Sequence, residues 1–109
     1  MAGKLHHVAL STAQFSQTVG FFRQVFSMTI SKEAGVAPAR QLWFHEGIQL
    51  NEVSYLSQGQ GACDHVAIAV EDRAACIQRA LSAGCTQIPG KPEHWLRMPE
   101  GICLELMEG

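Results

Sequence analysis

Two histidines at matching positions are the residues of this 109-residue chain best suited to chemistry. His7 lies in the segment HHVAL (6–10) and His65 in the segment DHVAI (64–68), which share three identical residues. Near the end of the chain, Glu105 interrupts a row of apolar residues. Imidazole nitrogen and carboxylate oxygen are ligands that suit borderline divalent ions. The sequence therefore predicts a metal site formed by these three side chains.

A second pair of matching segments indicates an internal duplication. The segment 42–48 (LWFHEGI) aligns with 96–102 (LRMPEGI), with identical Leu, Glu, Gly and Ile. In this alignment Asn51 takes the place of Glu105 and becomes a candidate fourth ligand. A neutral amide is a weaker ligand than a carboxylate, and Gln49, on the same face of its strand, is the alternative. The sequence leaves the fourth ligand open between Asn51 and Gln49.

Each half is expected to hold a strand, a helix and three further strands. Apolar residues at helical spacing predict one buried helix stripe in each half, and Ser11 or Thr12 can cap the first helix while Gly84 ends the second. The stripes consist of Phe15, Val19, Phe22, Val25 and Phe26, and of Ala75, Ile77, Ala80 and Leu81. Alternating patterns and turn residues predict strands at 5–11, 29–32, 39–45, 48–53, 64–70, 86–88, 94–98 and 102–107, with Glu46-Gly47 and Glu100-Gly101 as turns.

The polar faces of these strands should line a cavity, because each helix covers the opposite face of its sheet. Side chains alternate between the two faces of a strand, which places Cys103 beside Glu105 and turns His6 away from His7 as a second-layer or surface residue. Trp43, Trp95, Arg97 and Cys103 have the same polar parity and are candidate pocket residues, and Arg97 could bind a carboxylate or phosphate. The fold class is therefore predicted as α+β, with two tandem βαβββ modules forming a curved mixed sheet around a metal-binding cup.

Composition narrows the class of protein further. The net charge of −2 does not indicate a basic surface for binding nucleic acid. No run of apolar residues approaches the ~18–20 needed for a membrane-spanning helix. The four cysteines form no CxxC pair and predict reduced thiols. These features predict a cytoplasmic protein of one domain over 1–109, with halves at about 1–57 and 62–109 and a linker at 54–61.

Four segments together resemble the vicinal oxygen chelate superfamily, which includes glyoxalase I, methylmalonyl-CoA epimerase, fosfomycin-inactivating thiol transferases and bleomycin-binding proteins. The segments are LHHVAL (5–10), FFRQVFSM (21–28), DHVA (64–67) and MPEGICLEL (98–106). The resemblance covers nearly the whole chain and implies a glyoxalase-like domain. It also implies a divalent ion, either Zn, Ni, Mn, Fe or Co, held by His7, His65 and Glu105 with Asn51 or Gln49 as the fourth ligand.

The resemblance further implies an enzyme whose metal chelates two oxygens of a small, oxygen-rich substrate. Isomerase, lyase or thiol-transferase chemistry is expected, with Glu105 as the catalytic carboxylate that moves a proton. The alternative function is a metal-free protein of the bleomycin-resistance type, which sequesters an antibiotic or metabolite in a pocket with Trp43, Trp95 and Arg97. Members of the superfamily usually dimerise, so a homodimer is expected.

Overall fold

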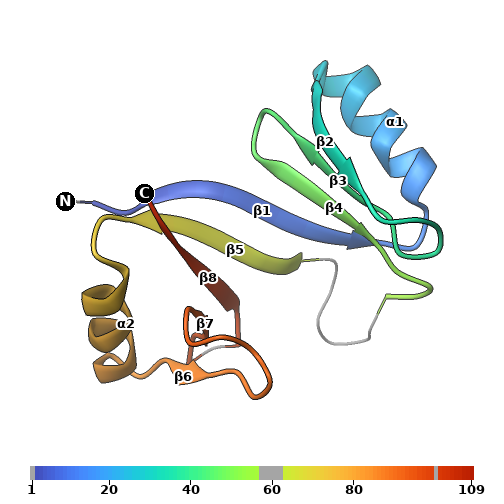
Figure 1. Cartoon of the computed structure of the whole chain (residues 1–109). Helices are drawn as coiled ribbons and strands as arrows, with labels where there is room; N and C mark the ends of the chain where they lie inside the picture. Colours follow the sequence, from blue (N-terminus) through green and yellow to red (C-terminus); the bar gives the residue numbers. More distant parts are fainter. Residues whose placement is uncertain (1, 57–62, 100) are drawn as a thin grey trace. The chain divides into compact units, whose positions relative to one another are not determined.

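The computed structural model describes residues 2–56, 63–99 and 101–109 (Figure 1). Within these ranges the order strand, helix, three strands occurs twice, which confirms the predicted α+β class and the two βαβββ modules. Most of the predicted linker, and Glu100 of the second predicted turn, lie outside the described residues. The first module comprises β1 (Lys4–Thr12), α1 (Phe15–Phe26), β2 (Ile30–Ala34), β3 (Gln41–Phe44) and β4 (Ile48–Glu52). The second comprises β5 (Cys63–Val70), α2 (Arg73–Ser82), β6 (Thr86–Gln87), β7 (Trp95–Arg97) and β8 (Cys103–Glu108).

The chain divides into two compact units, and the division does not follow the sequence order. One unit, here called the continuous unit, comprises Val8–Asp64. The other, here called the split unit, comprises Met1–His7 together with His65–Gly109. The strand β1 therefore contributes residues 4–7 to the split unit and residues 8–12 to the continuous unit. As a consequence, His7 belongs to the same unit as His65 and Glu105.

The continuous unit is a mixed sheet with α1 on one face (Figure 1). Its strand order is β2-β3-β4-β1, in which β1 runs parallel to β4 and the other neighbours are antiparallel. The buried core consists of Phe15, Leu42, Phe44 and Leu50. Because strand residues alternate between faces, Gln49 and Asn51 lie on the face opposite this core, as predicted.

Two details of α1 differ from the sequence-based prediction. Val25 and Phe26 are 58% and 56% exposed, so the predicted buried stripe is wrong at these positions. Val25 lies roughly 80° around the helix from Phe15 at 3.6 residues per turn, and Phe26, in the last turn, packs its ring near those of Phe21 and Phe22. The N-cap is Gln14 rather than Ser11 or Thr12, although the Thr12 hydroxyl accepts the Gln14 N–H at 3.1 Å.

The split unit repeats this plan, with β5 parallel to β8 and the order β5-β8-β7-β6. Ile77 of α2 packs with Leu96 and Leu106 in its buried core. The Asp72 carboxylate accepts the Ala75 N–H at 3.1 Å and caps α2, and Gly84 adopts a φ of 106° just after the helix, as predicted for its end. The opposite face of this sheet is left for Glu105 and its neighbours.

An ion pair in the continuous unit gives a pH-dependent contribution to stability. Arg40 Nη2 donates to Glu52 Oε2 at 2.8 Å and Arg40 Nε donates to Glu52 Oε1 at 2.9 Å, so the pair is bidentate. The guanidinium also lies 4.7 Å from the centre of the Phe15 ring. Hydrogen bonds from Arg40 lower the pKa of Glu52 from 4.5 to about 2.

We expect this pair to stabilise the fold above about pH 4.5 and to lose its contribution as the pH falls toward 2, because the folded-state pKa lies below the unfolded one. A Glu52→Gln variant should therefore show a flatter decline of the free energy of unfolding across this range. Urea unfolding at several pH values measures the decline, with Glu33→Gln, an exposed glutamate of β2, as the control. Equal declines in parent and Glu52→Gln would contradict the assignment.

Candidate metal centre

The two predicted histidine ligands meet in the split unit. His7 and His65 are 8% and 5% exposed, and their Nε2 atoms lie 3.2 Å apart. Ala67, two residues after His65 on β5, is fully buried, and its small side chain leaves room beside the imidazole. Burying two polar rings is unfavourable unless their nitrogens find partners. The two rings hydrogen-bond to each other through these atoms, so both Nε2 nitrogens are directed to the same point.

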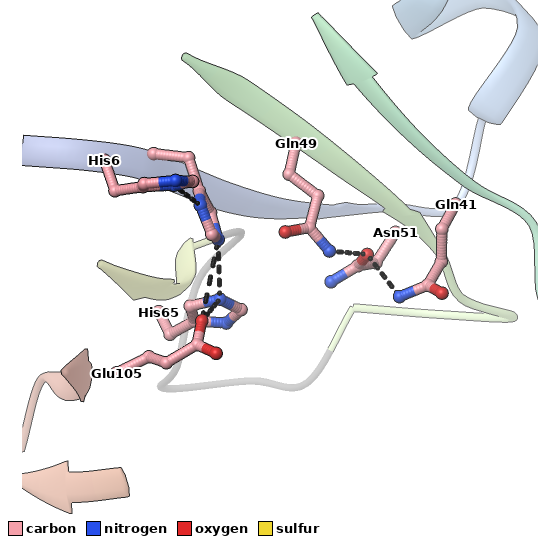
Figure 2. A network of polar contacts seen from close by, with 7 residues as sticks. His6, Gln41, Gln49, Asn51, His65 and Glu105 are labelled. Carbon is pink, nitrogen blue, oxygen red and sulfur yellow. Dashed lines mark hydrogen bonds and ion pairs between the residues drawn. The ribbon is translucent and has the colours of Figure 1, made fainter. Parts of the chain in front are cut away.

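Glu105 completes the group on β8, in register with Ala67 of β5. Its Oε1 lies 3.4 Å from His65 Nε2 and 3.7 Å from His7 Nε2, and Figure 2 shows the carboxylate beside the His65 ring. Among the described residues, these three offer donor atoms that all lie within 4.8 Å of one another and could hold a metal ion.

The spacing of these atoms fits a first-row divalent ion. Ligand atoms about 2.1 Å from such an ion lie roughly 3.0–3.4 Å apart at octahedral or tetrahedral angles. The distances of 3.2, 3.4 and 3.7 Å within the group are close to this range. Two imidazoles and one carboxylate also form a donor set that Zn, Ni, Mn, Fe and Co all accept. The geometry and the chemistry of the group are therefore both compatible with the predicted ion.

The electrostatics of the group favour the neutral form of His7. Burial lowers the pKa of His7 below its usual 6.5, and the neighbouring His65 and His6 lower the pKa further, while Glu105 raises it. A neutral imidazole has the free lone pair that a metal ion requires. At neutral pH, His7 is thus in the protonation state of a ligand.

Three further predicted pocket residues lie in the same unit. The Trp95 ring is 4.7 Å from the His65 ring at 74°, so Trp95 contacts the candidate centre directly. The Lys91 ammonium lies 4.7 Å from the centre of the Trp95 ring. Arg97 and Cys103 are cross-strand partners on the face of Glu105, and the exposed Arg97 donates from Nη1 to the Gly101 carbonyl at 3.1 Å.

The two candidates for the fourth ligand contact each other in the continuous unit. Gln49 Nε2 donates to Asn51 Oδ1 at 2.9 Å, and Gln41 Nε2 donates to the same oxygen at 3.2 Å (Figure 2). Asn51 Oδ1 therefore accepts from the amide groups of both Gln41 and Gln49, whereas Gln49 Oε1 takes no part in these two bonds. Trp43, the remaining pocket candidate, is the cross-strand partner of Gln49, and its ring lies 4.9 Å from the Lys32 ammonium.

Sequence reasoning missed the role of Gln41 and gave His6 only as a second-layer or surface residue turned away from His7. Gln41 is the cross-strand partner of Asn51. This pairing is known only once the register of the two strands is known. His6 is exposed, but its Nδ1 lies 2.8 Å from Nδ1 of His7. Its only signal in the sequence was its place next to a candidate ligand.

No protein-family model and no curated protein matches the sequence. Solved structures do match, at low sequence identity. Methylmalonyl-CoA epimerase from Mycobacterium tuberculosis is 18% identical, with a TM-score of 0.70 over 96% of this chain and 87% of the epimerase. A single-residue variant of the Streptomyces coelicolor epimerase, in complex with 2-nitronate-propionyl-CoA, is 17% identical, with a TM-score of 0.72 over 97% and 96% of the two chains.

The chain has the vicinal oxygen chelate fold. This superfamily also includes a 4-hydroxymandelate synthase variant from Streptomyces coelicolor, which matches at 16% identity with a TM-score of 0.75 over 96% of this chain and 37% of the synthase. The resemblance seen in the sequence is thereby confirmed for the fold. In the described part of the chain, no helix has the length and apolar character needed to cross a membrane.

Proposed function

We propose that the protein is a metal-dependent enzyme of the vicinal oxygen chelate type, with isomerase or lyase chemistry on a small substrate that binds through two oxygens. The observation that carries the proposal is the buried pair of His7 and His65, whose Nε2 atoms face each other at 3.2 Å with the Glu105 carboxylate alongside. The similar fold of two epimerases supports the same class of chemistry.

In this proposal His7, His65 and Glu105 hold a divalent ion, which when bound polarises substrate oxygens and stabilises negative charge that develops on them. Glu105 Oε1 is the oxygen that contacts the two imidazoles, and in this proposal Oε2 accepts or returns a substrate proton as the general base. Trp95 covers one side of His65 and helps to exclude water from the reacting atoms.

Of the two amides predicted as candidates for a fourth ligand, we favour Gln49 over Asn51 on the contacts within their own unit. The Asn51 oxygen already accepts two amide hydrogen bonds, at 2.9 and 3.2 Å, and would have to give them up to bind an ion. Gln49 Oε1 takes part in neither of these bonds, and Asn51 then orients the Gln49 amide as a metal-site neighbour should. With one carboxylate and two neutral imidazoles, a centre of His7, His65 and Glu105 keeps positive charge, which favours an anionic form of the substrate.

The test begins with metal binding. The chain is stripped with a chelator and titrated with Zn²⁺, Ni²⁺, Mn²⁺ and Co²⁺ while its thermal unfolding is followed. An ion that binds only the folded chain should add about 2.7 kcal/mol of stability at a hundredfold excess over its Kd. Small carbonyl acids and thioesters are then incubated in D₂O with the loaded protein, and deuterium uptake is measured by mass spectrometry.

Metal-dependent exchange of a substrate proton supports the proposed chemistry. A chain that no divalent ion stabilises would contradict it. Stabilisation by a small apolar or antibiotic ligand that is unchanged by chelator would instead indicate the sequestering function, with Trp43 and Trp95 as binding residues.

A further inference from the structure

We infer that His6 is a positioning residue for the metal centre, because its Nδ1 accepts a hydrogen bond from His7 Nδ1–H and keeps His7 Nε2 free for the ion. The inference rests on the metal site proposed above. Its basis is the 2.8 Å distance between the two Nδ1 atoms, with ring centres 5.0 Å apart at 75°. Figure 2 shows His6 on β1, with its ring directed along the strand toward this contact.

The direction of this hydrogen bond decides whether His7 can be a ligand. A neutral imidazole carries one N–H and one lone pair, so a ring that binds an ion through Nε2 must carry its proton on Nδ1. The atom within hydrogen-bond distance of His7 Nδ1 is Nδ1 of His6. If His6 donated instead, the His7 proton would lie on Nε2 and point into the ligand group. Metal binding is therefore compatible with one direction only, from His7 to His6.

The contact is not imposed by the backbone. Consecutive residues of a strand direct their Cβ atoms to opposite faces, and His6 has to turn its ring around the strand to reach His7. Since His7 is buried, an unpaired Nδ1–H would cost about 1–3 kcal/mol. His6 is exposed, so water can satisfy its own Nε2–H. A solvent-facing residue thus completes the hydrogen bonding of a buried ligand.

Two substitutions at residue 6 separate this role from a general structural one. In His6→Ala the acceptor is lost, whereas in His6→Asn the side-chain oxygen takes nearly the position of Nδ1. Loss of a hydrogen bond to a ligating histidine weakens metal binding by about 10- to 100-fold. We expect that loss for His6→Ala, recovery for His6→Asn, and no change for the control His45→Ala, which removes an exposed histidine of the continuous unit.

Metal affinity is measured by competition with a chromogenic chelator, using Zn²⁺ and Co²⁺. A second readout needs no variant: long-range ¹H–¹⁵N NMR of the Zn²⁺-loaded parent should show His7 protonated at Nδ1 and His6 at Nε2. Equal affinity of parent and His6→Ala would overturn the role of His6 and leave the metal site standing. The reverse pair of tautomers would overturn both the role of His6 and ligation through His7 Nε2. A parent chain that binds no divalent ion would overturn the proposed function and this inference together.

Discussion

Replacement of His65 by alanine is expected to weaken divalent-metal binding by more than about 100-fold, because losing a ligand should exceed the 10- to 100-fold effect of losing a second-layer partner. His65 Nε2 lies within 3.4 Å of both other donor atoms of the group, His7 Nε2 and Glu105 Oε1. Neither of these two side chains can take its position as a ligand unless the strands move. Of the group His7, His65 and Glu105, one imidazole and one carboxylate would remain, and such a reduced donor set holds borderline ions weakly. Isothermal titration with Zn²⁺ or Ni²⁺ measures the loss.

The matched control for this variant is His94→Ala. His94 belongs to the same unit and is half-buried, and its ring contacts Trp95 at 6.2 Å, but it is outside the ligand group. This variant should therefore bind metal as the parent does. If His65→Ala retained the parental affinity, or if both variants lost it equally, the ion would have to bind elsewhere.

Replacement of Leu96 by alanine should destabilise the protein by about 2–5 kcal/mol, the usual cost of a leucine-to-alanine cavity in a packed core. Leu96 is fully buried and packs with Ile77 of α2 and Leu106 of β8. A domain of this size has about 5–15 kcal/mol of total stability, so the loss is a large fraction of it. Because Leu96 follows Trp95 in β7, a cavity here also loosens the strand that carries the residue beside His65.

Urea unfolding of the metal-free proteins gives the change in free energy. Leu5→Ala is the control, since the same atoms are removed at a position that is 67% exposed, where effects are usually within about 0.5 kcal/mol. Equal destabilisation by the two variants would contradict the central place of Leu96 in the core of the split unit.

The internal repeat explains why so much could be predicted from sequence. Matching segments around His7 and His65 placed both residues on equivalent strands, and alternation along the last strand put Glu105 on the same face. Both inferences depend only on strand periodicity, and the structure brings the three side chains together. The cores around Leu50 and Leu96 follow from the same alternation.

Other features depended on contacts that one-dimensional patterns do not contain. Val25 and Phe26 were placed in the apolar stripe of α1 by their spacing from the other apolar residues. Whether side chains in the last turn of the helix are buried depends on how far the sheet extends beneath it. The preference for Gln49 over Asn51 follows from the amide of Gln41, which comes from a neighbouring strand. The contact of His6 with His7 depends on ring rotation, on which strand parity gives no information.

The membership of the first seven residues in the split unit has a consequence for how the protein is made. Ribosomes add about 5–20 residues per second, so His7 leaves the ribosome roughly 5–20 s before Glu105, about 100 residues later. During this interval the continuous unit can form its own contacts, while the first strand waits for the partners of residues 4–7. The nascent chain therefore assembles the group of His7, His65 and Glu105 last, only after Glu105 has emerged.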